Sequence, residues 1–316
     1  MKREVVPTAN LCRNWAEREP QVFSPVFRAD WTNALFIHWE IPAEELQSEV
    51  PYKLDLFDGR AFVSVVLFTM RGMRPARSGR IGRLLFAPAR EQRFLNFRTY
   101  VRHGNETGIY FLAEWISHGL CAALGRPLYG LPYHWGRHTF HLPPGHTKFS
   151  GRVTDRRRGE SFAWESRFSI ANSPWRTCPG GSLDEFLLER YTAFNSVGYR
   201  RKLFHIRHPK WMQTSAQVRL SDRGLLDSRF GWLPGVEPMA AHYSAGAFNV
   251  LMGPPESVDT SGHMRPVDPI PLSSLGLDFL SPERRRNEGV AKQDVLPNES
   301  HEGAIDLYVK HVIVGA

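Results

Sequence analysis

Histidine is the first residue type to consider for chemistry, because imidazole binds metal ions and transfers protons near neutral pH. Of the 13 histidines, four crowd one stretch and two form a second pair: His134, His138, His141 and His146, and then His205 and His208. On a strand, His134 and His138 share a face while His141 points away. Neither an H-E-x-x-H motif nor a suitably spaced carboxylate accompanies them. We therefore expect hydrogen-bonded or solvent-facing histidines, with no metal site and no cofactor.

A carboxylate on an apolar strand face is a better candidate for acid–base work. By strict alternation, Glu114 shares its face with other large side chains: Tyr110, Leu112 and Ile116. A carboxylate there must be paired or have a raised pKa. Arg98 lies on the polar face of a neighbouring predicted strand, together with Asn96. An inward-facing Arg98–Glu114 pair suits anion recognition or proton handling, while a structural ion pair or an exposed Glu114 are the alternatives.

The segment from residue 125 to residue 135 holds a Gly-x-Pro turn that would aim Tyr133 and His134. Neighbouring Tyr and His side chains donate, accept and transfer protons. Alternatively, Tyr133 and Trp135 are core aromatics and His134 faces outward. No nucleophile elbow, P-loop or dinucleotide fingerprint is present, and no reactive-thiolate pattern surrounds Cys121. Covalent catalysis therefore has little support in the sequence.

Short strands must position these residues. Residues 61–70 are apolar almost throughout, which predicts a strand covered on both faces. Residues 94–102 alternate, with Leu95, Phe97, Thr99 and Val101 opposite Asn96, Arg98, Tyr100 and Arg102. Further strands are predicted over 108–116, 147–154, 162–170 and 212–220. The dominance of short strands favours a barrel or a sandwich.

Three short helices are predicted beside these strands. A capping box, Ser182-Leu-Asp-Glu185, begins one of them. A second helix is expected from Ser117 to Leu124, ended by Gly125 and Pro127. The third covers 42–50. Helices therefore pack beside a β-dominated core.

Composition excludes several classes of protein. The chain has 316 residues with 42% hydrophobic and 23% charged residues, so it is neither disordered nor fibrous. No apolar run reaches the length of a membrane span, and the N-terminus shows no signal-peptide pattern. Three scattered cysteines, Cys12, Cys121 and Cys178, suit a reducing compartment. We expect a cytoplasmic protein without membrane contact; a homo-oligomer is an open alternative.

The formal net charge of +8 raises the question of nucleic-acid binding. Six arginines and no acidic residue lie between Arg71 and Arg90, but glycines and prolines among them predict a loop. No nucleic-acid recognition motif accompanies this loop. We expect solvated surface charge rather than nucleic-acid contact.

The composition changes once, near Gly253. All nine tryptophans precede it, and only Phe279 and Tyr308 are aromatic after it. Such a segment has little apolar surface to offset chain entropy. We predict a folded domain over 1–252 and a Pro-rich, mostly irregular tail over 253–316.

Six motifs in order resemble the YqjF-like family, a domain of unknown function: 35–39, 58–63, 96–101, 131–134, 189–194 and 208–213. Together they cover roughly residues 25–250. One departure is Lys210-Trp211-Met212, where the family tends to show a Pro-Trp-Pro-Leu run.

That family is similar to the acetoacetate-decarboxylase-like superfamily. The resemblance implies a closed antiparallel β-barrel, mainly β with a few packing helices, around a central pocket. In the decarboxylases a Gly-Phe-Pro turn precedes adjacent lysines, one of which forms a Schiff base. Here the corresponding turn, Gly130-Leu131-Pro132, is followed by Tyr133 and His134 instead of lysines. No lysine lies between Lys53 and Lys148. Arg98 falls near the position of a decarboxylase glutamate. The resemblance thus implies the barrel, while the departures argue against Schiff-base chemistry.

We therefore expect a barrel that binds a small anionic or carbonyl-bearing molecule. Candidate catalytic groups are Tyr133, His134 and Glu114; candidate ligand-binding groups are Asn96, Arg98 and His38. Arg98 would clamp an anion, and Tyr133 and His134 would orient a carbonyl or move a proton. Three functions remain open: a lysine-independent lyase, hydratase or isomerase; a non-catalytic small-molecule-binding barrel; and, third, a basic nucleic-acid-binding protein.

Overall fold

A computed structural model describes residues 23–77, 91–143, 147–168, 174–197, 200–258 and 264–266. These residues all fall within one compact unit, Met1–Asp268. Most of the predicted tail, the second half of the arginine-rich loop, Cys12 and His146 lie outside the described residues. No helix among the described residues has the length and apolar character needed to cross a membrane.

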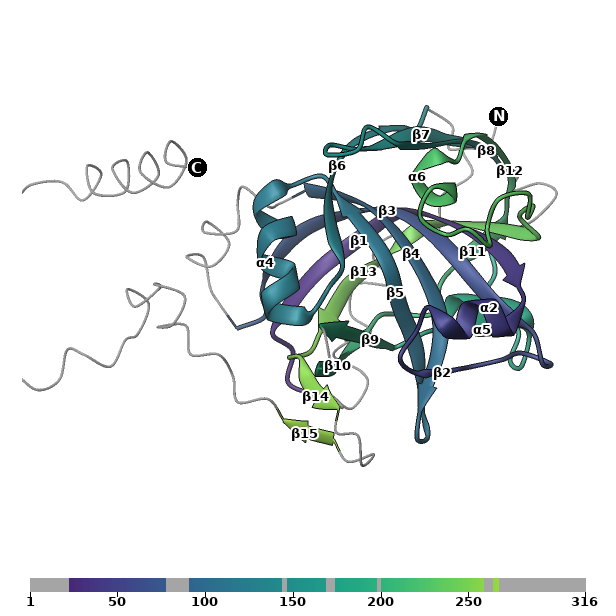
Figure 1. Ribbon diagram of the computed structural model, residues 1–316. Coiled ribbons are helices and arrows are strands. Elements are labelled where there is room, and N and C mark those ends of the chain that lie inside the picture. The colour runs from purple at the N-terminus through teal and green to yellow at the C-terminus, as the bar shows by residue number, and fades with distance from the viewer. Residues whose placement is uncertain are drawn as a thin grey trace, which may run out of the picture. The chain divides into compact units, whose positions relative to one another are not determined.

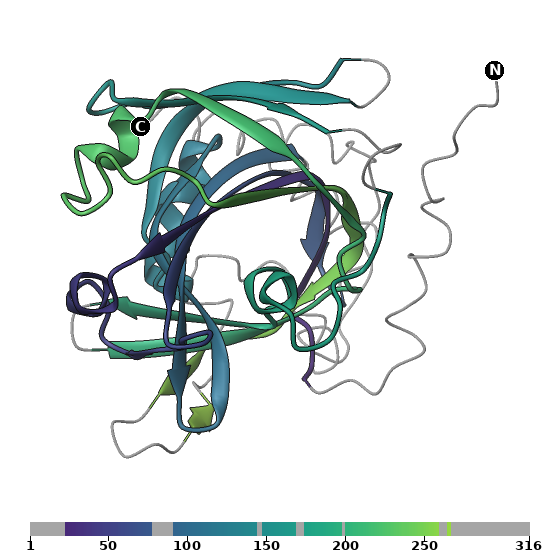
Figure 2. The same cartoon turned by 90° about the vertical axis from the view of Figure 1, so that its right-hand side faces the viewer.

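Seven strands pair in a ring, which Figure 2 shows end-on. Each strand pairs with the next, and the last pairs again with the first. In ring order they are β5 (Glu106–Ile116), β4 (Glu91–His103), β3 (Ala61–Pro75), β1 (Phe27–Ile41), β13 (Ala240–Met252), β10 (Arg200–Arg207) and β9 (Thr192–Val197). The predicted purely antiparallel order is wrong at β5, which runs parallel to both β9 and β6.

A second layer continues the sheet from β5 over the outer face of the ring (Figure 1). Its strands are β6 (Tyr133–His141), β7 (Lys148–Asp155), β8 (Ser161–Arg167) and β12 (Gln217–Asp222). The remaining short strands are β2 (Lys53–Leu54), β11 (Gln213–Ser215), β14 (Glu256–Val258) and β15 (Met264–Pro266). β14 pairs with β10, so the sheet extends past residue 252.

The two layers explain why the ring strands are buried on both faces. Leu35, Ile37 and Trp39 of β1 belong to an outer cluster together with Phe149 and Trp164 of the second layer. The intervening inward residues belong to an inner cluster of apolar side chains: Phe36, Phe62, Val66, Phe94, Phe111, Leu187, Phe204 and Ile206. All of Ala61–Met70 is buried, which confirms the prediction of a strand covered on both faces.

Four short helices among the described residues accompany the sheet: α2 (Ala43–Ser48), α4 (Gly119–Tyr129), α5 (Leu183–Leu188) and α6 (Gly224–Asp227). The capping box at α5 is confirmed in one half: Ser182 Oγ accepts a hydrogen bond from the Glu185 N–H at 3.2 Å. The Glu185 carboxylate accepts from the Gly181 N–H instead of from the cap residue. Figure 2 shows α5 within the opening of the ring, where the Phe186 ring lies 5.0 Å from that of Tyr100.

The prediction that Gly125 and Pro127 end a helix is wrong, because α4 continues to Tyr129. Gly125 instead meets a packing requirement. A Cβ atom at this position would lie 2.2 Å from Cε2 of Tyr133. Only glycine leaves room for that ring against the helix.

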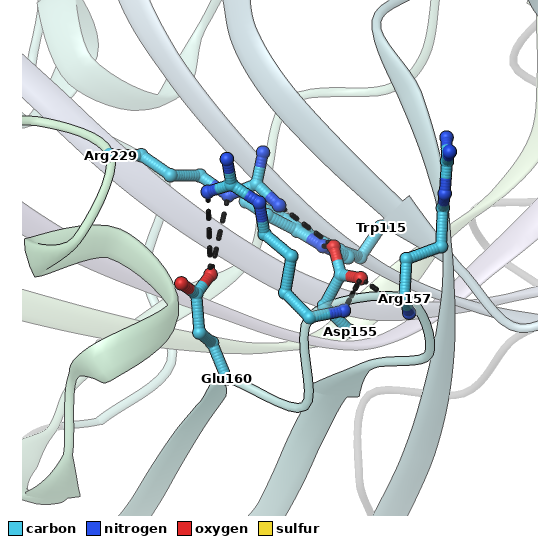
Figure 3. Close-up of polar contacts among 6 residues, drawn as sticks. Trp115, Asp155, Arg157, Glu160 and Arg229 are labelled. Atoms are coloured by element: carbon cyan, nitrogen blue, oxygen red, sulfur yellow. Dashed lines mark hydrogen bonds and ion pairs between the residues drawn. The ribbon is translucent and has the colours of Figure 1, made fainter.

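Asp155 at the end of β7 connects the second layer to the ring (Figure 3). Its carboxylate accepts from Trp115 Nε1 at 2.9 Å and from the backbone N–H of Arg157 at 2.8 Å, and it pairs with Arg229 at 2.8 Å. Hydrogen bonds and the Arg229 guanidinium lower the pKa of Asp155 although burial opposes them. The carboxylate is fully engaged by structural partners and is not free for chemistry.

Candidate functional site

Arg98 lies on the inner face of the ring, on β4. The predicted alternation of this strand is confirmed: Leu95 and Phe97 belong to the outer cluster, and Tyr100 to the inner one. The face that looked polar is therefore the face turned into the ring. Arg98 is 8% exposed, donates from one terminal nitrogen to the Leu187 carbonyl at 3.2 Å and lies 5.8 Å over the Phe36 ring. Burial lowers its pKa.

Glu114 faces the same interior from β5. The register shifts between Phe97 and Arg98, so that Phe97 pairs with Ala113 and Arg98 pairs with Phe111. Leu112 is thus the extra residue of a β-bulge, and the faces exchange there. Glu114 shares its face with Phe111 rather than with Tyr110 and Leu112, which pack against the outer cluster. The predicted grouping was wrong because alternation alone does not reveal a bulge.

Glu114 and Arg98 interact electrostatically without direct contact. Glu114 is 2% exposed, and burial raises its pKa well above the ordinary value although Arg98 opposes this. No ion pair within 4.0 Å joins the two described side chains. The Glu114 carboxyl therefore favours its neutral form, which can donate a hydrogen bond.

Three polar atoms of Asn96, Arg98 and Glu114 have no hydrogen-bond partner among the described residues. They are Arg98 Nε, Glu114 Oε2 and Asn96 Oδ1. Asn96 lies directly opposite Glu114 in the β4–β5 register. Buried polar atoms are nearly always paired with protein, water or a ligand. These three atoms mark the place on the inner face where a ligand or ordered water would be stabilised.

Tyr133 begins β6 beside Glu114 in the parallel β5–β6 pair. Its ring packs against α4 at Gly125 and lies 6.3 Å from the Phe94 ring. Burial raises the pKa of Tyr133 well above its ordinary value, and the nearby Glu114 adds to the effect. Tyr133 is thus a hydrogen-bond donor of fixed protonation near neutral pH.

His134 lies on the opposite face of β6. Its ring stacks on the outer-cluster residue Trp115, with centroids 5.1 Å apart. The structure therefore places Tyr133 beside Glu114 but turns His134 to the other face of the strand. Trp135, the predicted companion of Tyr133 in the core, is 46% exposed and lies under the Arg156 guanidinium.

His38 lies inside the ring, fully buried, and is part of a chain of hydrogen bonds. Its Nδ1 lies 2.6 Å from Ser64 Oγ, and its Nε2 lies 3.2 Å from Nδ1 of His242. The chain continues from His242 Nε2 to Asp184 at 3.2 Å and from Ser64 Oγ to the Tyr100 hydroxyl at 2.6 Å. Sequence reasoning missed four of its members: Ser64, Tyr100, Asp184 and His242. Local spacing carries no signal for partners more than 200 residues apart.

Two other buried histidines, His138 and His208, are held by backbone carbonyls. His138 Nε2 lies 3.1 Å from the Trp115 carbonyl, and His208 Nδ1 lies 2.8 Å from the Pro209 carbonyl. Burial lowers the pKa of each to about 4. No group of three or more His, Cys, Asp or Glu side chains suited to a metal ion occurs among the residues described.

Lys202 on β10 faces the interior of the ring. It shares a face of the strand with Phe204 and Ile206 of the inner cluster, and burial and Arg200 lower its pKa.

Two surface hollows of about 400 and 530 Å³ lie elsewhere, over β6, β7 and β8, and share His141, Ser150 and Glu165. The residues that line these hollows do not include the inner polar groups.

The arrangement of strands is that of the acetoacetate-decarboxylase-like fold. An acetoacetate decarboxylase-like enzyme from Sphingomonas wittichii RW1 superposes with a TM-score of 0.53 at 15% identity, over 73% of this chain and 92% of that chain. Acetoacetate decarboxylase from Legionella pneumophila gives 0.51 at 11% identity, over 81% and 97%. The enduracididine biosynthesis enzyme MppR, solved in complex with pyruvate, gives 0.51 at 11% identity, over 77% and 94%.

The chain belongs to the DUF2071 family of uncharacterised conserved proteins, whose family model matches residues 28–247. The uncharacterised protein YqjF of Bacillus subtilis (strain 168) is 28% identical over 227 residues, which cover 69% of this chain and 87% of that protein. The resemblance expected from the motifs is therefore confirmed, and the fold is acetoacetate-decarboxylase-like as the resemblance implied, with a mixed rather than purely antiparallel sheet.

Proposed function

We propose that the ring of strands is a closed barrel and that its interior binds a small carboxylate- or carbonyl-bearing molecule. The observation that carries this proposal is the set of unpartnered buried atoms: Arg98 Nε, Asn96 Oδ1 and Glu114 Oε2. They come from the adjacent strands β4 and β5 and lie on the inward face of both. A cation, an amide and a neutral acid placed together recognise a small anion with an adjacent polar group.

Each side chain has a role in this proposal. The Arg98 guanidinium clamps the carboxylate, because its planar fork matches two carboxylate oxygens. The Tyr133 hydroxyl and the protonated Glu114 carboxyl donate hydrogen bonds to the neighbouring carbonyl. This polarisation favours loss of a proton from the adjacent carbon, as in a lyase, hydratase or isomerase that uses no lysine. A non-catalytic binding barrel is the alternative, in which the same groups only recognise the ligand.

Pyruvate is the probe we choose, because it is the smallest stable 2-oxo acid and the similar fold of MppR has been solved with it. Thermal unfolding is measured for the full chain with and without pyruvate. Ligand at 100 times its Kd stabilises a protein by about 2.7 kcal/mol. We expect stabilisation of the wild type, none in Arg98→Met, and an unchanged response in the exposed-site control Arg77→Ala. Equal responses of the two variants would refute the proposed binding site.

A second experiment separates an enzyme from a binder. In D₂O, NMR follows exchange of the pyruvate methyl protons, which requires enolisation. Exchange that is catalysed by the wild type and lost in Tyr133→Phe, with thermal stabilisation retained, supports the lyase, hydratase or isomerase class. Stabilisation without exchange favours the binding barrel.

A further inference from the structure

We propose that Tyr100, Ser64, His38, His242 and Asp184 form a proton relay between the Arg98 site and the outer end of α5. The inference deepens the proposed function, on which its chemical use rests. The relay itself is a property of the ligand-free protein.

The relay is continuous in the structure. Four contacts of 2.6, 2.6, 3.2 and 3.2 Å join the five side chains in order. Ser64, His38 and Tyr100 are fully buried, and His242 is 4% exposed. The members come from β4, β3, β1, β13 and α5, so closure of the ring is what brings them together. Such a buried, fully connected chain resists competition from water.

The two ends differ in a way that a relay requires. At the inner end, the Tyr100 hydroxyl donates to the Leu187 carbonyl at 2.9 Å, and Arg98 donates to the same oxygen. Tyr100 is therefore adjacent to the group proposed to hold the ligand. At the outer end, the Asp184 side chain is 27% exposed and lies 3.7 Å from Arg176. Protons can thus leave to solvent at Asp184 but not at Tyr100.

Proton counting gives the chain two arrangements with the same heavy-atom positions. In the outward arrangement, the Tyr100 hydroxyl turns its proton from the Leu187 carbonyl to Ser64, and the Leu187 carbonyl keeps Arg98 as its donor. Ser64 donates to His38 Nδ1, His38 Nε2 to His242, and His242 Nε2 to Asp184. In the inward arrangement, both nitrogens of His242 donate, His38 donates from Nδ1 to Ser64, and Ser64 donates to Tyr100. The inward arrangement holds one more proton, which makes His242 an imidazolium beside the Asp184 carboxylate. His38 stays neutral in both and changes only its tautomer.

Proton abstraction from a bound ligand would convert the outward arrangement into the inward one. The ligand C–H bond breaks, its electron pair stays on the ligand as an enolate facing Arg98, and the proton binds Tyr100 Oη. Tyr100 passes its own proton to Ser64, Ser64 to His38 Nδ1, and His38 Nε2 to His242. Release of the His242 Nε2 proton through Asp184 to solvent leaves both histidines as Nδ1–H tautomers. Entry of a solvent proton at His242 Nε2 then moves one proton back along the chain, from His242 to His38, Ser64 and Tyr100, and Tyr100 returns a proton to the enolate, which restores the outward arrangement. No oxidant, metal or further reactant is needed.

The charged groups around His38 and His242 support a neutral His38 at the centre of the relay. Burial lowers the pKa of His38 well below its ordinary value, and His242 from β13 and Arg98 from β4 lower it further. Asp184 on α5, held by Arg176, is the carboxylate that faces His242. The His242 contact lowers the pKa of Asp184. Only His242 of the two rings contacts a carboxylate, so the inward arrangement places its extra proton on His242.

Long-range ¹H–¹⁵N NMR of the histidine rings tests the relay without a ligand. Spectra are recorded between about pH 5 and about pH 9, the range in which an imidazole loses its charge. We expect His38 to remain neutral and to switch from the Nδ1–H to the Nε2–H tautomer as the inward arrangement gives up its extra proton. In Asp184→Asn the imidazolium loses its carboxylate, so the switch is expected at lower pH. In Tyr100→Phe the outward arrangement loses its inner donor, so the midpoint is also expected to move.

A fixed His38 tautomer across the whole range, in the wild type and in Asp184→Asn, would overturn the relay. So would a His38 switch that does not follow the titration of His242. Asp184 is partly exposed, so its variant tests the relay even where Tyr100→Phe does not fold. Because no ligand is present, failure here leaves the pyruvate response of the Arg98 site untouched, and the two proposals fail separately.

Discussion

Replacement of Arg98 by Met is expected to change the free energy of unfolding of the ligand-free protein by no more than about 1 kcal/mol. Arg98 is a buried cation with no carboxylate within 4.0 Å, so its desolvation is not offset by an ion pair. The Leu187 carbonyl keeps the Tyr100 hydroxyl as a donor after the substitution. Met has nearly the same length and costs nothing to desolvate. A ligand-binding arginine should therefore be dispensable for stability.

Arg190 provides the matched control. Its guanidinium is also buried and lies 5.2 Å over the Tyr100 ring, but it contacts Asp55 at 2.8 Å. Arg190→Met removes the partner of the Asp55 carboxylate, whose side chain is only 15% exposed. Breaking a buried pair from one side typically costs about 3–5 kcal/mol. Both arginine side chains are buried, but only Arg190 of the two has a carboxylate partner.

Urea denaturation of the full chain, monitored by tryptophan fluorescence, measures both effects. Thermal unfolding gives a second measure, because about 1 kcal/mol shifts Tm by about 2–4 °C in a domain of this size. We expect Arg98→Met within a few degrees of the wild type and Arg190→Met lower by roughly 6–20 °C. A loss of stability in Arg98→Met equal to that in Arg190→Met would show that Arg98 is a structural ion, and the reasoning for the ligand site would fail.

Three further outcomes are expected. Burial lowers the pKa of His138 to about 4, below the unfolded value of about 6.5, so stability present above pH 6.5 is lost as the pH falls toward 4. His138→Gln should reduce the slope of unfolding free energy against pH in that window by up to about 1.4 kcal/mol per pH unit, and an unchanged slope would contradict this. Gly125→Ala should destabilise the protein by about 1–3 kcal/mol, because the new Cβ meets the Tyr133 ring and this outweighs the higher helix propensity of alanine. The control Gly231→Ala, with no atom within 4 Å of its Cβ, should not destabilise it. Equal Tm values of the two variants would contradict the packing argument. Borohydride with pyruvate should leave no adduct detectable by mass spectrometry; an adduct lost in Lys202→Met would identify Lys202 as a Schiff-base lysine and refute the lysine-independent chemistry.

Alternation in the sequence predicted the faces of β4 correctly but did not show which face is inside. Asn96, Arg98 and Tyr100 form a polar row, whose inward placement we expected from the proposed Arg98–Glu114 pair, while Leu95 and Phe97 form an apolar row. Both rows are buried, because the second layer covers the outer face. Burial on two sides depends on a sheet formed by distant residues, so the local pattern does not contain it.

The grouping of candidate residues could be predicted where the strands follow each other in the chain. It could not be predicted where it depends on the pairing of the distant strands β1 and β13. Arg98 and Glu114 are read from neighbouring strands. His38 and His242 meet only because β1 pairs with β13, at a separation of 204 residues. His134 was expected beside Tyr133, yet successive residues on a strand face opposite ways, and a single alternation separates them.

The bulge at Leu112 gives a practical guide for aligning relatives of this chain. Because Leu112 is the extra residue, a relative that lacks one residue here would pair regularly and still turn its counterpart of Glu114 into the ring. When sequences of related proteins are aligned, a one-residue gap in this strand should therefore be placed at Leu112, so that Phe111 and Glu114 both keep their columns. An alignment without that gap would match the carboxylate with an outward-facing residue and hide a shared position.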